Sequence, residues 1–389
     1  MNKRVFIIVL DSLGIGEMPD AHLYGDEGSN TLGAVSRSER FDVPFLGLLG
    51  LFDIDGVAPQ SAPMRVLGSY GRMAEKSPGK DTTTGHWEIA GVVLDKPFPV
   101  FPDGFPEEVL TRLKQATGRE VLCNKPYSGT KVIADYGREH VKTGALIVYT
   151  SADSVLQIAA HEDVVPLKEL YSACEAARSI MQGEFAVGRI IARPFIGEYP
   201  NFTRTANRRD YSLDPGPNLL DHLKDVGLDV IGVGKIPDIF AGRGITRSVA
   251  AKNNRECMEA ILSLTQESFC GLCFANLVDF DMLYGHRNDV DGYAQALTYF
   301  DRDLRELLPL LQEDDMLILT ADHGCDPSTP STDHSREYIP LLVYGNHVRA
   351  DVNLGTRESF ADIAATVQEY LGLAIMTPGK TFLHEISEV

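Results

Sequence analysis

Asp322 and His323 lie side by side at the end of the short aliphatic run Leu317–Thr320, a pattern typical of a buried strand. A carboxylate next to an imidazole is a mixed oxygen and nitrogen donor pair, which both Zn²⁺ and Mn²⁺ accept. Because open α/β sheets bind ligands outside the carboxyl ends of their strands, this position is also that of a site. Taken alone, however, an Asp-His dipeptide is more often a turn at the protein surface.

Asp11 and His334 are two further side chains of the same chemical types. Asp11 ends the apolar run Arg4–Leu10, which predicts a first strand. It could equally cap a following helix, which is a common use of aspartate after a strand. His334 lies eleven residues beyond His323 and, by itself, could be a lone histidine in a surface loop.

Asp281 and His286 follow a third expected strand, Phe269–Val278. Residues five apart do not share one face of an α-helix, so these two side chains would have to converge through a loop. The amphipathic helix expected at Asp291–Leu311 then leads to the strand that precedes Asp322. Strand, helix and strand form a βαβ unit, which places Asp281 and Asp322 at the same edge of a parallel sheet.

Together these side chains are what two adjacent divalent ions require, about three protein ligands for each with positions left for substrate oxygens. Each side chain has another explanation alone, but that all of them cluster at strand ends by chance is improbable. Two divalent ions also carry more positive charge than three aspartates offset, so a phosphoryl dianion would be attracted. The candidate ligands are Asp11, Asp281, His286, Asp322, His323 and His334.

The polar run Asp81–Glu88 contains three consecutive threonines, Thr82, Thr83 and Thr84. It could be a turn followed by the start of a helix, with Asp81 or Thr84 as the N-cap. A hydroxyl that accepts a phosphoryl group would also suit this position, because the free N–H groups and the dipole of a helix N-terminus favour phosphate oxygens. Since a threonine hydroxyl is a poor nucleophile without a metal or a base, this role depends on the metal site.

The length of the chain and a proline-rich crossing after residue 95 predict two domains. Residues 97–213 have the pattern of an inserted small α+β domain, for which the family resemblance given below implies the role of a cap. Residues 1–96 and 214–389, in which strands and helices alternate, would form a discontinuous metal-binding catalytic core. Within the cap we expect three strands and one helix, at 145–151, 155–160, 187–192 and 166–181.

Several charged side chains could hold the phosphate groups of a substrate. In a chain with 36 basic and 55 acidic residues, an arginine cluster beside a domain boundary is a reasonable anion clamp, since guanidinium pairs bidentately with phosphate. Arg204, in the same stretch, is expected to be solvated, as most charged runs are. The candidate substrate-binding residues are Asp153, Arg193, Arg208, Arg209 and Lys235.

The net charge of −19 works against nonspecific binding to nucleic acid or to an anionic membrane. No stretch approaches the roughly 18 apolar residues that span a bilayer, and the apolar N-terminal run is too short for a signal peptide. Cys270 and Cys273 are the one closely spaced pair of cysteines; within a strand they would point to opposite faces, which favours reduced structural thiols. We therefore expect a cytoplasmic protein with no nucleic acid, membrane or evident protein partner.

Five stretches of this sequence resemble those of one enzyme family, the phosphopentomutases of the alkaline phosphatase superfamily, which are related to cofactor-independent phosphoglycerate mutases. The stretches are DSLGIG, GKDTTTGHWE, VDFDMLYGH, TADHGCDP and TDHSREYIPLLVYG. The similarity spans nearly the whole chain. It implies an α/β fold, with an alkaline-phosphatase-like core whose mainly parallel sheet is flanked by helices, and an inserted smaller α+β cap domain.

The resemblance also implies roles for the candidate residues. One Mn²⁺ would be held by Asp281, His286 and His334, and the other by Asp11, Asp322 and His323. Thr82 would bridge the two ions as the phosphorylated nucleophile, because it occupies the place of the serine in the Asn-Ser-x-x-Gly-His run of the related mutase.

The implied reaction interconverts ribose 1-phosphate and ribose 5-phosphate, or the 2-deoxyribose equivalents, through a phosphothreonine and a sugar bisphosphate. A sugar bisphosphate such as glucose 1,6-bisphosphate would phosphorylate the enzyme. The cap would protect the phosphothreonine from water. The alternative is a metal-dependent phosphomonoesterase or phosphodiesterase of the same superfamily, whose cap admits water. A noncatalytic binding protein with this fold would be expected to lack ligands or the hydroxyl of Thr82, and the sequence retains all of them.

Overall fold

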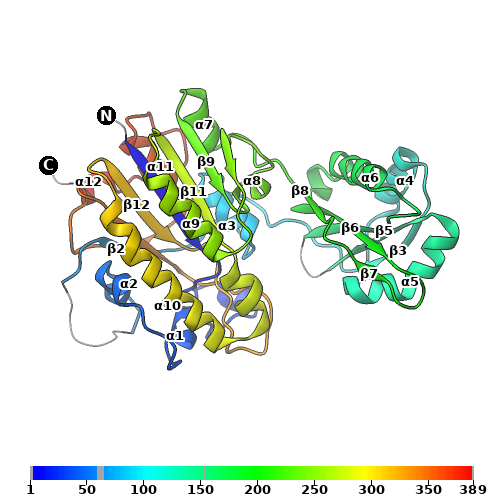
Figure 1. Ribbon diagram of the computed structural model, residues 1–389, viewed down its shortest axis with the longest axis horizontal. Helices are drawn as coiled ribbons and strands as arrows, with labels where there is room; N and C mark the ends of the chain where they lie inside the picture. Colours follow the sequence, from blue (N-terminus) through cyan, green and yellow to red (C-terminus); the bar gives the residue numbers. More distant parts are fainter. Residues whose placement is uncertain (1–2, 59–64, 152–153, 388–389) are drawn as a thin grey trace. The chain divides into compact units, whose positions relative to one another are not determined.

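The computed structural model describes residues 3–58, 65–151 and 154–387. The chain divides into two compact units (Figure 1). The core unit comprises the described residues up to Lys96 and from Pro215 onward, and the inserted unit comprises Pro97–Asp214. In the described residues, no helix is long and apolar enough to cross a membrane.

The core unit is built on a sheet for which the described residues supply eight strands, in the order β10-β9-β11-β1-β12-β13-β2-β14. The five strands from β10 to β12 are parallel to one another, and β13 runs antiparallel to β12 and to β2. The bounds are β1 Arg4–Leu10, β2 Ser69–Met73, β9 Asp229–Val233, β10 Arg247–Val249, β11 Gly271–Leu277, β12 Asp315–Thr320, β13 Ile339–Tyr344 and β14 Val352–Arg357.

Strand β1 lies at the centre of the parallel region, between β11 and β12. All seven of its residues are buried, as expected for a strand covered on both faces. Leu10 pairs with Leu277 of β11, and Val9 pairs with Thr320 of β12. The three strands therefore end together, and the residues that follow them meet at one edge of the sheet. The predicted crossover from β11 to β12 spans β1, which lies between them.

Helices of the core unit form two contacting groups, one containing α1, α2, α9 and α10 and the other containing α3, α7, α8 and α11 (Figure 1). Helix α10 ends at Leu307, earlier than predicted, because Pro309 has no N–H group to continue the helical hydrogen bonds. The bounds are α1 Thr31–Val35, α2 Pro44–Leu48, α3 Thr82–Ile89, α7 Leu219–Asp225, α8 Ile236–Ile239, α9 Asn254–Thr265, α10 Val290–Leu307, α11 Ala361–Tyr370 and α12 Leu383–Ile386.

The inserted unit has a mixed sheet in the order β3-β4-β5-β6-β7, with β8 also paired to β6. One hydrophobic cluster contains residues of α4 and α6 and another contains residues of α5, so apolar side chains of the sheet pack in two separate cores. The bounds are β3 Val121–Pro126, β4 Leu146–Thr150, β5 Val155–His161, β6 Arg189–Ile196, β7 Thr203–Arg204, β8 Arg209–Ser212, α4 Glu107–Thr117, α5 Gly129–Thr143 and α6 Leu167–Ile180.

All six cysteines lie in the described residues, and all are free thiols. Cys270 lies just before β11 and only Cys273 lies within it, so the predicted strand began too early. Burial raises the pKa of the Cys273 thiol to about 12, which keeps it protonated at neutral pH.

A buried ion pair joins the first residues of β1 and β12. The guanidinium of Arg4 donates to both carboxylate oxygens of Asp315, at 2.7 and 2.5 Å, and also to the carbonyl oxygens of Thr265 and Glu267. Both side chains of the pair are 1% exposed. Removing one partner of such a pair leaves an uncompensated charge in the interior.

We expect Asp315→Asn to lower the free energy of unfolding of the core unit by about 3 kcal/mol. Thermal unfolding measured by circular dichroism checks this. Glu259→Gln is the matched control, because its ion pair with Arg255 is exposed to solvent and should change stability by less than about 0.5 kcal/mol. Equal effects of the two substitutions would contradict this prediction.

Candidate metal centre and active site

The structure brings the candidate ligands together at the edge of the sheet where β1, β11 and β12 end. Two groups of three residues each offer ligand atoms that lie within 4.8 Å of one another inside the group. The first group is Asp281, His286 and His334, as expected for one ion. The second is Asp11, Asp281 and His323, so Asp281 takes the place that was expected for Asp322.

Asp281 and His286 converge through helical turns rather than through the expected loop. A π-helical turn spans Phe280–Tyr284, and a 3₁₀ turn spans Gly285–Arg287. The π turn carries Asp281 and the 3₁₀ turn after it carries His286, and Nε2 of His286 lies 3.1 Å from Oδ2 of Asp281. The prediction of a loop was wrong because it considered the geometry of the α-helix alone.

Two of the histidines are oriented by backbone carbonyl groups. Nδ1 of His286 lies 2.7 Å from the oxygen of Thr332, and Nδ1 of His323 lies 3.0 Å from the oxygen of Gly324. A carbonyl oxygen can only accept, so Nδ1 carries the proton in each ring. Nε2 is then the ring atom that can bind a metal when the imidazole is neutral, an arrangement common among histidine ligands.

The carboxylates have unequal affinities for protons. Burial, together with the negative charges of Asp322 and Asp281, raises the pKa of Asp11 well above its usual range. Burial also acts to raise the pKa of Asp281, but the neighbouring His334 and His286 outweigh it and hold that pKa well below its usual range. Like charges crowded in the interior are the condition that a bound cation relieves.

Unsatisfied oxygens support the same conclusion. Within the described residues, Oδ1 of Asp11, Oδ1 of Asp281 and Oδ2 of Asp322 are buried and accept no hydrogen bond. Such atoms cost stability unless a ligand pairs with them. Oxygen atoms beside imidazole nitrogens suit Mn²⁺ or Zn²⁺, so the residues present fit a divalent metal site.

Thr82 is the first residue of α3. The carboxylate of Asp81 caps this helix by accepting from the backbone N–H groups of Thr83 and Thr84, at 3.0 and 3.2 Å. It also accepts from the hydroxyl of Thr84. The hydroxyl of Thr82, in contrast, lies 3.2 Å from Nε2 of His323. Of the three threonines, Thr82 is the one with a hydroxyl in contact with a candidate metal ligand.

His86 was not singled out from the sequence, although it lies one helical turn after Thr82. Its buried ring places Nδ1 2.8 Å from the carbonyl oxygen of Thr82 and 3.1 Å from Oδ2 of Asp322. Beside it, Gly85 leaves no room for a side chain, since a Cβ atom there would lie 2.1 Å from the carbonyl oxygen of Asp322. Helix α3 therefore packs directly on the segment that carries Asp322 and His323.

Asn276 and Ser12 are two further residues that the sequence analysis missed. Nδ2 of Asn276, a buried polar residue in the apolar strand β11, donates to Oδ2 of Asp11 at 3.1 Å. The backbone N–H of Ser12 donates to Oδ1 of Asp322 at 3.1 Å. Ser12 has a φ of 69°, an uncommon conformation for a residue other than glycine. A polar residue within an apolar strand is the signal that could have identified Asn276.

Glu337 joins the loops around the ligands. Its buried carboxylate accepts from the backbone N–H of Gly16 at 3.1 Å and from the hydroxyl of Ser335 at 2.7 Å. It also accepts from the N–H and the hydroxyl of Thr31. The loop after β1 and the segment that contains His334 are thereby held to one another.

The candidate substrate-binding residues lie in both units. Lys235, just after β9, is close enough to Asp11 for its positive charge to oppose the raised pKa of that carboxyl. In the inserted unit, burial and then the charge of Arg208 lower the pKa of Arg193 to about 10. Arg208 pairs with Asp210 at 2.6 Å. Asp153 lies outside the described residues.

Two neighbouring arginines have contacts that the sequence did not indicate. Arg204 lies beside the buried hydroxyl of Tyr149 and contributes to the positive field at Arg193, so it is not simply solvated. Arg209 packs over the ring of Tyr171, at 4.3 Å from the ring centre. Arg208, just before β8, pairs instead with Asp210, so these two arginines have different partners.

Solved structures share the fold at low sequence identity. A phosphoglycerate mutase of Leishmania mexicana, solved at low cobalt concentration, is 13% identical with a TM-score of 0.51, and 98% of each chain is covered. The PH0037 protein of Pyrococcus horikoshii is 15% identical with a TM-score of 0.50, and 96% of this chain and 98% of that chain are covered. The predicted α/β fold, with a sheet flanked by helices, is confirmed.

Sequence comparison identifies the family. The model of the metalloenzyme superfamily matches residues 3–375. A phosphopentomutase of Lachnoclostridium phytofermentans is 60% identical over 385 residues, covering 98% of this chain and 99% of the relative. A phosphopentomutase of Thermotoga maritima is 55% identical over 392 residues, covering 99% of this chain and all of the relative. The chain therefore belongs to the phosphopentomutase family of isomerases, within the metalloenzyme superfamily.

Proposed function

We propose that this enzyme interconverts ribose 1-phosphate and ribose 5-phosphate, and the 2-deoxyribose equivalents, with Thr82 as the phosphoryl carrier. The name of its relatives indicates a pentose phosphate substrate. The observation that carries the proposal is the 3.2 Å contact between the hydroxyl of Thr82 and His323, at the start of a helix that packs against the candidate metal ligands.

Two Mn²⁺ ions would be held by two sets of three ligands. Asp281, His286 and His334 would hold one, and Asp11, Asp322 and His323 the other. Asp281 lies near both sets, and we assign it to the first because it contacts His286 and His334 at 3.1 and 3.5 Å. Asp322 is assigned to the second set because its Oδ2 atom lies 3.3 Å from Nε2 of His323, which also lies 3.5 Å from Oδ1 of Asp11. When bound, the two ions would make the hydroxyl of Thr82 more nucleophilic and neutralise the charge of the phosphoryl group.

Thr82 would cycle between free and phosphorylated forms. The bond between Oγ1 of Thr82 and phosphorus breaks as the sugar hydroxyl oxygen bonds to phosphorus; the sugar hydroxyl loses a proton and Thr82 regains one. The sugar bisphosphate then reorients and returns its other phosphoryl group to Thr82. A sugar bisphosphate such as glucose 1,6-bisphosphate would supply the first phosphoryl group and leave as the monophosphate.

Cationic side chains would hold the phosphate that is not being transferred. In the core unit this role falls to Lys235, whose charge acts on Asp11. In the inserted unit Arg193 and Arg208 are the candidates, since their charges lie near each other and near Arg204, an arrangement that favours an anion. Arg209, which packs over Tyr171, is left out of the proposal.

Product analysis separates this function from that of a phosphatase with the same ligands. The enzyme is incubated with ribose 1-phosphate, Mn²⁺ and a catalytic amount of glucose 1,6-bisphosphate, and ribose 5-phosphate and free phosphate are both measured. We expect ribose 5-phosphate to dominate, because the phosphoryl group passes to a sugar. Dominant release of free phosphate would instead establish the phosphomonoesterase alternative.

Thr82→Val should remove the phosphoryl acceptor and lower the mutase activity by roughly 10³-fold or more. Intact-mass analysis after incubation with glucose 1,6-bisphosphate should show one added phosphate on the wild type and none on the variant. Thr83→Val is the matched control, because the two threonines are adjacent and have the same shape, and it should still be phosphorylated. Phosphate on Thr82→Val, or its loss from Thr83→Val alone, would show that the nucleophile is misassigned.

Asp11→Asn should have opposite effects on stability in the absence and presence of Mn²⁺. Without metal, the substitution removes a buried negative charge that is repelled by two other carboxylates. We therefore expect the free energy of unfolding to increase by about 1 kcal/mol and the thermal midpoint to rise with it. In the wild type, Mn²⁺ at a hundred times its Kd should add about 2.7 kcal/mol, and the variant should gain less and lose activity. A variant that gains as much stability from Mn²⁺ as the wild type would exclude Asp11 as a ligand.

A further inference from the structure

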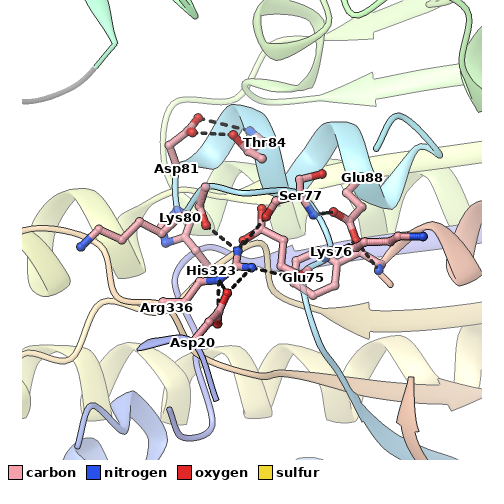
Figure 2. Close-up of polar contacts among 12 residues, drawn as sticks. Asp20, Glu75, Lys76, Ser77, Lys80, Asp81, Thr84, Glu88, His323 and Arg336 are labelled. Atoms are coloured by element: carbon pink, nitrogen blue, oxygen red, sulfur yellow. Dashed lines mark hydrogen bonds and ion pairs between the residues drawn. The ribbon is translucent and has the colours of Figure 1, made fainter. Parts of the chain in front are cut away.

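The backbone segment from Glu75 to Asp81 leads directly into Thr82 and wraps around one side chain, that of Arg336. The Nη1 group of Arg336 donates to the carbonyl oxygens of Ser77 and Gly79, at 2.9 and 2.6 Å, and its Nη2 group donates to that of Glu75 at 2.8 Å (Figure 2). The side chain is 3% exposed. Three carbonyl groups of one short segment therefore depend on a single guanidinium.

Two carboxylates balance the charge of Arg336. Oε2 of Glu75 lies 2.7 Å from Nη1, and Oδ2 of Asp20 lies 3.0 Å from Nη2. Burial raises the pKa of Glu75 well above its usual range, and Arg336 opposes that rise. The guanidinium is thus held in a fixed orientation by partners on two sides, and the carbonyl groups that it contacts are fixed with it.

Glu88, on α3, holds the opposite side of the same segment. Its carboxylate accepts from the backbone N–H groups of Lys76 and Ser77, at 2.9 and 2.6 Å (Figure 2). Three carbonyl groups of the segment are therefore paired with Arg336, and two of its N–H groups with Glu88. Both anchors are buried, so water does not compete for these hydrogen bonds.

Arg336 also lies two residues after the candidate ligand His334. Its backbone N–H donates to Oδ2 of Asp26 at 2.9 Å, and its carbonyl oxygen accepts from Met18 at 3.0 Å. Asp26 in turn pairs with Lys80, in the segment before Thr82, at 3.0 Å. Arg336 is therefore the residue at which the loop after β1, the segment before Thr82 and the segment with His334 are joined.

We propose that Arg336 is a positioning residue that sets the place of the Thr82 hydroxyl relative to the metal ligands. This inference rests on the proposed role of Thr82 as phosphoryl carrier. Arg336 touches none of the reacting atoms in this arrangement; it acts through the carbonyl groups of the segment that ends at Thr82. A misplacement of about 1 Å at a reacting group can slow a reaction by roughly 10²-fold, so such an anchor affects the rate of phosphoryl transfer.

Lysine cannot replace this guanidinium. An ammonium group has three N–H donors on one atom, whereas the guanidinium has five in a planar fork that reaches several acceptors at once. Arg336→Lys would keep the charge near Glu75 and Asp20 but leave carbonyl groups of the segment without donors. The substitution therefore tests position separately from charge.

The test measures transfer of phosphate from glucose 1,6-bisphosphate to Thr82 in the Mn²⁺-loaded enzyme, by rapid quench and intact mass. We expect Arg336→Lys to slow this transfer at least 10-fold, while the KM for ribose 1-phosphate and the affinity for Mn²⁺ change by less than 3-fold. Arg357→Lys is the matched control. Arg357 is also largely buried and pairs with Asp362 and Glu385, but it lies on β14 and should keep the wild-type rate within 2-fold.

A second variant keeps the test decisive if Arg336→Lys does not fold. Glu88→Gln weakens the other side of the segment without removing Arg336, and it should slow the same transfer by several-fold with an unchanged KM. If the wild type carries phosphate on Thr82 and both Arg336→Lys and Glu88→Gln transfer it as fast as Arg357→Lys, the positioning role is excluded and the proposed function stands. If the wild type itself carries no phosphate on Thr82, the proposed function fails, and the positioning role fails with it.

Discussion

Mutual repulsion among three buried carboxylates is the interaction on which the rest of this structure depends. Asp11, Asp281 and Asp322 are brought together because β1, β11 and β12 are parallel neighbours that end at the same edge of the sheet. The backbone of the sheet leaves them no freedom to separate. Burial, and then the charges of Asp322 and Asp281, raise the pKa of Asp11, while neighbouring histidines hold the pKa values of the other two carboxylates below their usual range. Divalent cations are the partners that such an arrangement favours.

The segments around this cluster are held in place by contacts with one another. Helix α3 packs against the carbonyl group of Asp322 through Gly85, and His86 contacts both Thr82 and Asp322. Glu337 holds the loop after β1 to the segment with His334. The hydroxyl of Thr82 is therefore located by the same network that locates the ligands, so the proposed nucleophile and metals form one unit.

Local patterns in the sequence predict the strands of the core unit and most of the candidate ligands. Apolar runs followed by Asp11, Asp281 and Asp322 identify strands and their carboxyl ends, and the rule that parallel strands share an edge brings the acids together. Local pattern does not reveal the backbone conformation of a turn or an ion pair between residues far apart in the sequence. The π turn between Asp281 and His286 is a choice of backbone hydrogen bonding, and Arg336 finds Glu75 across 261 positions of sequence. Likewise, a run of two arginines does not reveal that Arg208 pairs with Asp210 while Arg209 packs over Tyr171.

We propose that six side chains would hold two metal ions beside the hydroxyl of Thr82. Anomalous X-ray diffraction at the manganese edge, from crystals grown with Mn²⁺, tests it most directly. The account predicts two peaks, one among Asp281, His286 and His334 and the other among Asp11, Asp322 and His323, with Oγ1 of Thr82 between them. A single peak, or two peaks from which Thr82 is remote, would contradict it.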